Sequence, residues 1–318
     1  MVAPVPRPAP SASLIDPSAL MSIRSLELRA RAVVEGFLHG LHRSPYHGFS
    51  VEFTEYRPYT AGDDPRYLDW RVLARSDRYF LKKFEDETNL RCHLLVDHSR
   101  SMEFGTRGYT KARYAATLAA TLAYFLHLQG DAVGLLTFDE KVREYLPARH
   151  RPGHLRQLMI ALEKPAEGRA TDLGSPLERI VSLVRKRGLV ILISDFLAPL
   201  DRLERDLLTL TACGHEVTVF QVLDPAEQTL GLEQAALFED VETGRTLYLD
   251  PAAARDGYVK KLKAHCEGLK ASCRKLGVSH HLLVSDQPLE LAMFEFLHER
   301  ELRGRRFRPS ARNAGGGR

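Results

Sequence analysis

The chain has 318 residues, of which 44% are hydrophobic and 27% are charged. A chain of this length can bury one large core, or one core with a smaller companion. The 45 basic and 41 acidic residues leave a net charge of only +4. This balance gives no sign of a nucleic-acid-binding domain, and we expect no nucleic-acid partner.

Cysteine usage and hydropathy narrow the class of protein further. The four cysteines, Cys92, Cys213, Cys266 and Cys273, are scattered and form no Cys-x-x-Cys pair. This spacing predicts free thiols in a reducing compartment rather than disulfides or a zinc site. No stretch approaches the roughly 18 apolar residues of a membrane span, and the N-terminus lacks the apolar core of a signal peptide. We therefore expect a cytoplasmic protein with no membrane span.

The N-terminal part is expected to extend the main domain. Residues 1–12 are rich in Pro, Ala and Ser, which predicts disorder. Asp16-Pro17 has the pattern of a helix start, and apolar residues follow at helical spacing as far as Leu38. Residues 44–89 combine strand-like alternation with a turn. We therefore expect residues 13–89 to form a helix and β extension packed on the core.

Arginines and acidic residues alternate in the segment 52–75. The favoured interpretation is an ion-pair network and a turn that tie this segment to the core. A recognition surface near the first core strand is the alternative. The pair Asp63-Asp64 could also bind a metal, although Asp-Asp-Pro is common turn chemistry.

From residue 90 to 303, apolar strand-like runs alternate with amphipathic helical patterns. The periodicity predicts strands near 92–96, 130–139, 142–146, 189–195, 216–223 and 279–285, and helices near 111–128, 154–162, 175–187, 200–212, 258–276 and 290–303. A β-hairpin is expected near 236–249, and a disordered Arg/Gly-rich tail at 304–318. This order predicts an α/β fold, a doubly wound and mostly parallel sheet with helices on both faces.

The stretch after the first core strand carries the chemistry. Cys92–Val96 is an apolar run that ends in Asp97-x-Ser99-x-Ser101. In open α/β sheets, ligands bind at the carboxyl ends of strands. Carboxylate and hydroxyl oxygens are hard donors that suit Mg²⁺, Mn²⁺ or Ca²⁺. The alternative is a loop whose Asp and Ser side chains cap the next helix.

Two further segments favour the metal interpretation. Thr171 lies in a Gly-rich loop and can bring a hydroxyl from elsewhere in the chain, and a second apolar strand ends in Ser194-Asp195. If the strands are parallel, these residues meet Asp97 at one edge of the sheet. Asp139 and Asp172 are lower-ranked candidates for metal ligands. Asp172 is also well placed to cap the following helix.

Together these five residues resemble the metal-ion-dependent adhesion site of the von Willebrand factor A fold. That site uses Asp-x-Ser-x-Ser, a Thr from a second loop and an Asp that ends a later strand. The resemblance implies a von Willebrand A-like core in which Ser99, Ser101 and Thr171 bind the ion directly. It also implies that Asp97 and Asp195 act mostly through bound waters, with one position left open for a partner's acidic side chain.

A second resemblance covers roughly residues 40–300. Glu52-Phe53, Arg57-Pro58-Tyr59, Gly62-Asp63-Asp64 and Asp69-Trp70, followed by the Asp97 loop, resemble an uncharacterised bacterial family with a von Willebrand factor A-like domain. Its members are typically encoded beside MoxR-type AAA+ ATPases. The resemblance implies a metal-dependent protein-binding module, not an enzyme, that assists such an ATPase in maturing or remodelling a client protein.

Two other functions compete with this interpretation. A metal-assisted hydrolase or phosphatase could use Mg²⁺ to activate water, but only His98 is adjacent to the candidate site in sequence. The Arg-rich tail could contact nucleic acid, although a solvated tail is the commoner outcome.

Overall fold

The computed structural model describes residues 14–43, 56–58, 80–82, 90–165, 174–184, 186–231, 236–239 and 246–307. The chain divides into a large unit, residues 1–43 with 90–318, and a small unit, residues 44–89. In the small unit, β1 (Tyr56–Pro58) pairs antiparallel with β2 (Phe80–Lys82). The rest of the segment 52–75, with both roles considered for it, lies outside the described residues, as does the N-terminal stretch 1–12. The disordered tail expected at 304–318 begins too early, because the last helix continues to Phe307; residues 308–318 lie outside the described residues.

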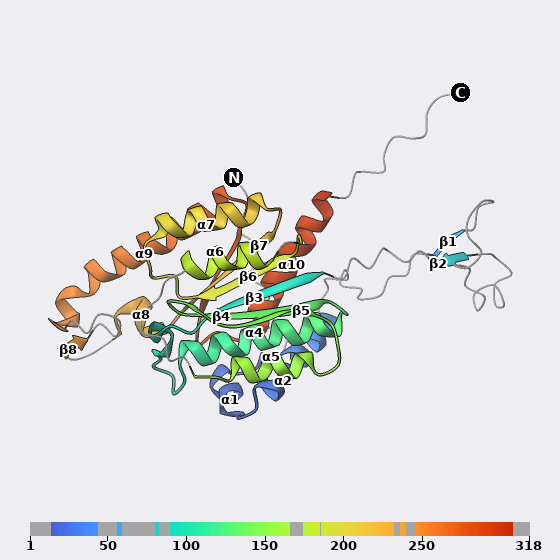
Figure 1. The fold of residues 1–318 in the computed structure, drawn as a ribbon. Helices are drawn as coiled ribbons and strands as arrows, with labels where there is room; N and C mark the ends of the chain where they lie inside the picture. Colours follow the sequence, from blue (N-terminus) through green and yellow to red (C-terminus); the bar gives the residue numbers. More distant parts are fainter. Residues whose placement is uncertain are drawn as a thin grey trace, which may run out of the picture. The chain divides into compact units, whose positions relative to one another are not determined.

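The large unit is built on a six-stranded sheet in the order β10-β7-β6-β3-β4-β5 (Figure 1). The strands are β3 (Arg91–Asp97), β4 (Ala132–Phe138), β5 (Val142–Arg149), β6 (Leu189–Ser194), β7 (Glu216–Leu223) and β10 (Ser279–Val284). All neighbours pair in parallel except β5, which is an antiparallel edge strand. The chain order reverses between β3 and β6, as in doubly wound folds. The predicted α/β architecture, a doubly wound and mostly parallel sheet, is confirmed.

Strand composition follows from burial on both faces of the sheet. Every residue of β6 is buried, as is every residue of β3 after Arg91. Parallel strands covered on both faces need continuous apolar runs, and these two sequences supply them. The edge strand β5 is only partly buried, which accords with its alternating polar and apolar residues.

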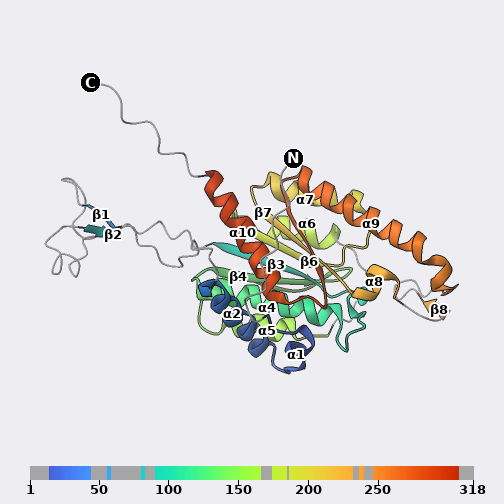
Figure 2. The same cartoon turned by 180° about the vertical axis from the view of Figure 1, so that it is seen from behind.

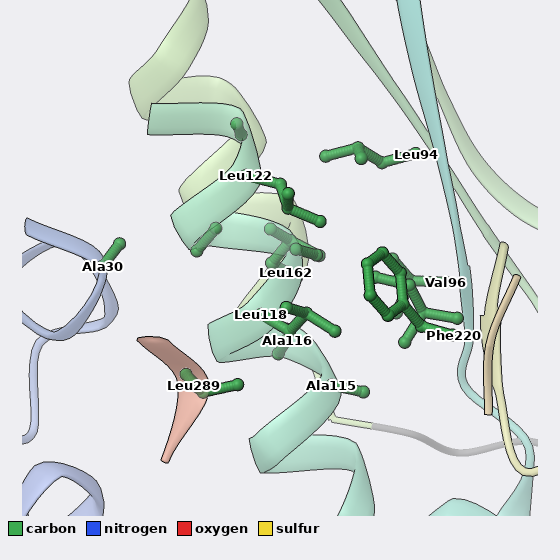
Figure 3. Close-up of a cluster of buried hydrophobic side chains, with 14 of the residues drawn as sticks. Ala30, Leu94, Val96, Ala115, Ala116, Leu118, Leu122, Leu162, Phe220 and Leu289 are labelled. Carbon is green, nitrogen blue, oxygen red and sulfur yellow. The ribbon is translucent and has the colours of Figure 1, made fainter. Parts of the chain in front are cut away.

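Helices cover both faces of this sheet (Figures 1 and 2). One buried cluster joins the sheet to α4 (Lys111–Leu128), α5 (His154–Leu162) and α10 (Leu289–Phe307). The other joins it to α6 (Gly174–Leu183), α7 (Leu200–Ala212) and α9 (Pro251–Lys275). Figure 3 shows α4 between two layers, with Leu118 and Leu122 toward Leu94 and Val96 of the sheet and Ala30 on the other side.

The N-terminal helix pattern is split in two. The sequence predicted one continuous helix, but α1 (Pro17–Ser22) ends before α2 (Leu26–Arg43) begins. Ser25 explains the break, because its side-chain oxygen accepts from the Leu28 amide at 3.3 Å. Such a side-chain contact satisfies a helix start and competes with continued helix. Leu26 and Ala30 of α2 pack in the same buried cluster as α4.

Other elements can be compared with the sequence interpretation one by one. Short helices η2 (Arg100–Glu103) and α8 (Pro225–Thr229) were not predicted, and α9 begins at Pro251 rather than near Tyr258. The hairpin is present, with β8 (Ala236–Glu239) antiparallel to β9 (Thr246–Leu249). All four cysteines are free thiols, as predicted. Among the described helices none is both long and apolar enough to cross a membrane.

Gly134 allows the edge strand to approach the sheet. A Cβ at this position would lie 2.6 Å from the amide nitrogen of Ala148 and 2.8 Å from the carbonyl oxygen of Leu146. The β4–β5 register shifts at this point. We expect Gly134→Ala to lower the free energy of unfolding by about 2 kcal/mol, a typical cost of forcing atoms into a packed site, measured by urea denaturation.

Gly257 of α9 is the matched control, because an added Cβ there meets no atom within 4 Å. Gly257→Ala should raise stability by about 0.5–1 kcal/mol through helix propensity. If Gly134→Ala were as stable as the unaltered protein, the described approach of β5 would be wrong.

Candidate metal centre

The sheet register brings two predicted site carboxylates to the same edge. Val96 of β3 is paired with Ile193 of β6. Asp97 therefore ends β3 directly beside Ser194, and Asp195 follows at the end of β6. These strands flank the point where the strand order reverses, which is the expected ligand position in such sheets.

Asp97 is held by hydrogen bonds from two neighbouring residues, Ser99 and Ser194. Its side chain is completely buried. One carboxylate oxygen accepts from the Ser99 amide at 2.8 Å, and the other accepts from the Ser194 hydroxyl at 2.6 Å. The first contact forms the turn that carries the loop out of β3, and the second joins the ends of β3 and β6.

The two loop serines converge. The side-chain oxygens of Ser99 and Ser101 are 3.1 Å apart, close enough for one to donate to the other. Ser99 is completely buried and Ser101 is half-buried. The hydroxyl pair thus extends from the buried Asp97 toward the surface, a geometry in which both oxygens can face one small ion.

A buried ammonium group stands beside the second carboxylate. Lys111, the first residue of α4, donates to Asp195 at 2.9 Å and to Glu227 of α8 at 2.6 Å. Neither the Lys111 nor the Asp195 side chain is more than 2% exposed. Asp195 also accepts from the Leu197 amide at 3.3 Å. This triad joins the start of α4, the end of β6 and α8.

The remaining predicted residues fall into two groups. Thr171 and the lower-ranked Asp172 lie outside the described residues, so the hydroxyl predicted from the second loop stays a prediction. Asp139, the other alternative, ends β4 but turns to its own loop, where it accepts from the Lys141 amide at 2.9 Å and pairs with Arg143. The structure thus brings Asp97, Ser99, Ser101 and Asp195 to one edge and leaves Asp139 in a separate turn.

A protein-family model described as "Protein of unknown function DUF58" matches residues 55–268. The chain belongs to the DUF58 family. An uncharacterized protein of Mycobacterium tuberculosis is 31% identical over 268 residues, which cover 82% of this chain and 83% of the relative. The predicted resemblance to an uncharacterised family is therefore confirmed at the level of the family.

Solved structures give more distant likenesses. Conserved hypothetical protein BatB from Bacteroides thetaiotaomicron has a TM-score of 0.45 at 14% identity, covering 67% of this chain and 99% of BatB. The SpRpn10 VWA domain has a TM-score of 0.38 at 15% identity, covering 63% of this chain and 92% of that domain. The fold of this DUF58 member rests on its own strand order and covered sheet faces.

The electrostatics of the DUF58 site follow from burial. Desolvation, together with the nearby Asp195 carboxylate, raises the pKa of Asp97 to about 7 against the opposing effect of the hydrogen bonds from Ser194 and Ser99. Burial also raises the pKa of Glu227. Burial alone would lower the pKa of Lys111, but Asp195 and Glu227 outweigh it, and the net shift is upward. Lys111 is therefore a permanent cation in this site.

The donor set can be tested against a divalent ion. When ionised, Asp97, Asp195 and Glu227 together with Lys111 leave two net negative charges, which one divalent cation would balance. In the described part of the chain, no three His, Cys, Asp or Glu side chains are grouped to hold a metal. An ion here would depend on the Ser99 and Ser101 hydroxyls, as hard oxygen donors allow. The residues thus fit such an ion in charge balance and in donor type, with hydroxyl oxygens in place of a carboxylate cluster.

Lys111 and Glu227 were missed by sequence reasoning. Glu227 had a usable signal, because Asp224-Pro225-Ala226-Glu227 is a capping-box pattern, and α8 shows both of its hydrogen bonds. The sequence signal for Lys111 was weaker. A cation in the first turn of a helix opposes the helix dipole and calls for nearby carboxylates.

The raised pKa of Asp97 predicts a pH-dependent stability. Between pH 3.8 and about 7 the folded protein holds a proton that the unfolded chain has lost. Stability therefore falls as pH rises through this window. With EDTA present, we expect Asp97→Asn to raise the free energy of unfolding at pH 8 by on the order of 2–3 kcal/mol, and to raise it by less at pH 5, measured by urea denaturation.

The amide can replace both hydrogen bonds, because Asn offers one acceptor to the Ser99 amide and one donor to Ser194. Asp201→Asn, at an exposed position in the first turn of α7, is the control and should show no such pH dependence. A destabilising Asp97→Asn effect at pH 8 would contradict the raised pKa.

Removal of Lys111 leaves two buried carboxylates without their cation. We expect Lys111→Met to lower the free energy of unfolding by about 3–5 kcal/mol, the cost of breaking a buried pair from one side. Lys111→Met with Glu227→Gln should recover part of this loss, because one of the two charges is then gone. Equal unfolding free energies for the single and double variants, measured by urea denaturation, would show that Glu227 is not coupled to Lys111.

Proposed function

We propose that this DUF58 protein is a metal-dependent protein-binding module. A divalent cation, Mg²⁺ or alternatively Mn²⁺ or Ca²⁺, would be held by the Ser99 and Ser101 hydroxyls with Thr171, while Asp97 and Asp195 balance its charge. The bound ion supplies an electrophilic position that a carboxylate of a partner protein can fill.

One observation carries this proposal. The Asp97 and Asp195 carboxylates end neighbouring parallel strands on the two sides of the strand-order reversal, with two hydroxyl oxygens 3.1 Å apart in the loop between β3 and α4. A loop that only capped α4 would not need this pair, because α4 already has Thr110 as its cap, accepting from the Arg113 amide at 3.2 Å. The capping interpretation of the Asp-x-Ser-x-Ser stretch is therefore the weaker one.

The site favours binding over hydrolysis. His98, the histidine adjacent in sequence, has its side chain against a cleft that Leu26, Arg29 and Thr110 also line. Burial lowers its pKa. It is therefore directed to the side of the loop that faces α2 and α4. We propose no catalytic residue, and we assign the module to a cytoplasmic setting with its thiols reduced.

The partner is proposed from the family resemblance. Members of the family are typically encoded beside MoxR-type AAA+ ATPases, so we propose that such an ATPase, or the client it remodels, supplies the carboxylate. A binding module beside an ATP-driven motor needs an attachment that can be made and released, and a single metal–carboxylate contact meets this need.

The proposal predicts metal-dependent binding that is lost in one variant. Immobilised full-length protein should bind a MoxR-type ATPase from the same organism at least about tenfold more tightly with Mg²⁺ than with EDTA, since one charge-assisted contact is worth about that much. Asp97→Ala should abolish the difference, because it removes a charge that holds the ion. Biolayer interferometry measures both affinities.

Asp201→Ala, an exposed acidic position on α7, is the control and should bind like the unaltered protein. Circular dichroism should show that Asp97→Ala is folded. An affinity that neither EDTA nor Asp97→Ala changes would remove the metal from the proposed function.

A further inference from the structure

A cleft of about 550 Å³ lies beside the candidate metal loop. His98 and Glu103 of the loop line one side, and Leu26 and Arg29 of α2 line another. Its size is within the roughly 300–1,000 Å³ range of ligand pockets. The split between α1 and α2 and the start of α4 therefore create a defined recess, not only a packing seam.

Positive charge dominates this cleft. Arg24, Arg29, Arg113 and Lys164 line it, against Glu103 and Glu163. Two of these charged side chains already have hydrogen-bonding partners. Lys164 pairs with Glu144 at 2.6 Å, and Glu163 accepts from the Leu26 amide at 3.1 Å. The three arginines remain as the main charge facing the cleft.

Arg29 is the most unusual of them. Its residue is only 5% exposed, and its Nε is buried with no hydrogen-bond partner. Its hydrogen-bonding contact is to the sulfur of Met21, at 3.3 Å from Nη1. Burial and the nearby Arg113 guanidinium lower the pKa of Arg29 to about 10, although the Glu163 carboxylate acts in the opposite direction. A buried guanidinium whose Nε has no hydrogen-bond partner is costly, and an anionic ligand that bonds to it would reduce that cost.

Arg113 and Arg24 complete the arginine group. Arg113 donates from one terminal nitrogen to the Met21 carbonyl at 2.6 Å, which fixes it at the end of α1. Arg24 is exposed in the break between the two helices. In the part of the chain that the structure describes, no ion pair joins Arg24, Arg29 or Arg113 to a carboxylate. Guanidinium groups bind carboxylates through paired hydrogen bonds.

The lining argues for an acidic peptide rather than a small inorganic anion. Leu26, Leu162 and Pro165 also line the cleft, and these apolar groups suit the carbon atoms of a chain that carries acidic side chains. The cleft is continuous with the loop that carries Ser99 and Ser101, because His98 and Glu103 belong to both. A segment held at the loop can therefore extend to the arginines.

We propose that this cleft binds an acidic segment of the same partner protein whose neighbouring carboxylate reaches the metal loop. For the identity of the partner, this inference rests on the proposed function. Arg29 and Arg113 bind carboxylates of the segment, and Arg24 guides it from the surface.

The test uses the full chain and a short fluorescein-labelled peptide of alternating glutamate and alanine, with binding measured by fluorescence anisotropy in EDTA. Arg29→Met should weaken binding at least about tenfold, as loss of a charge-assisted pair predicts. Its melting temperature should change little, because Met keeps most of the buried length of Arg29 and removes a charge that burial disfavours. Arg24→Gln, at an exposed position, should weaken binding severalfold without affecting the core.

Arg31→Met is the matched control on the same helix. Arg31 is 59% exposed and pairs with Glu35 at 2.7 Å, so peptide affinity should be unchanged. Unchanged affinity in Arg29→Met would overturn the proposal. Inorganic phosphate that binds through Arg29 while the peptide does not would also overturn it, in favour of a small-anion pocket.

The metal variant separates this inference from the proposed function. In EDTA, Asp97→Ala should bind the peptide like the unaltered protein, because the cleft does not need the ion. Loss of peptide binding in Arg29→Met with no effect of Asp97→Ala on ATPase binding would support the cleft and contradict the metal function. The reverse pattern would contradict the cleft alone.

Discussion

The structure depends on the ammonium group of Lys111, buried between Asp195 and Glu227. A cation at the first residue of a helix is opposed by the helix dipole, and burial without partners would cost several kcal/mol. The two carboxylates compensate both effects. The two ion pairs also fix where α4 begins relative to the end of β6. The loop from Asp97 to Thr110 is therefore held at both ends, which restricts where the Ser99 and Ser101 hydroxyls can lie.

Asp224 performs a similar task at the next strand. It ends β7, caps α8 by accepting from the Ala226 amide at 2.9 Å, and accepts from the Thr106 amide and hydroxyl at 2.9 and 2.6 Å. Thr106 belongs to the same loop as Ser99 and Ser101. The carboxyl ends of β3, β6 and β7 are thus joined through side chains, and the candidate site is positioned by the sheet rather than by its own loop.

The parts of this arrangement that sequence reasoning found are those with a local signal. Continuous apolar runs predicted β3 and β6 because burial on both faces leaves no polar alternation, and parallel pairing then placed Asp97 near Asp195. The break between α1 and α2 was missed because the apolar spacing continues through Ser25. Ile23 is extended after α1, and the Ser25 contact with the Leu28 amide starts α2. Lys111 and Glu227 meet only in the folded chain, so spacing could not join them. The Arg29 recess was missed for the same reason, since a basic residue in an amphipathic helix usually faces solvent.

The two faces of one loop explain how a single partner could be recognised twice. On one side, Ser99 and Ser101 stand beside the buried carboxylates. On the other, His98 and Glu103 line the arginine cleft. Negative charge in the protein on the first side attracts a cation, and positive charge on the second attracts carboxylates. Under the proposed function, an acidic segment would be favoured by both sides, through the ion on one and through guanidinium groups on the other.

Two contacts on one segment act as linked sites, so the second forms at high effective concentration once the first is made. A weak metal contact could then give selective binding. A partner with one isolated carboxylate would make the contact at the metal loop or the contact at the arginine cleft, but not both.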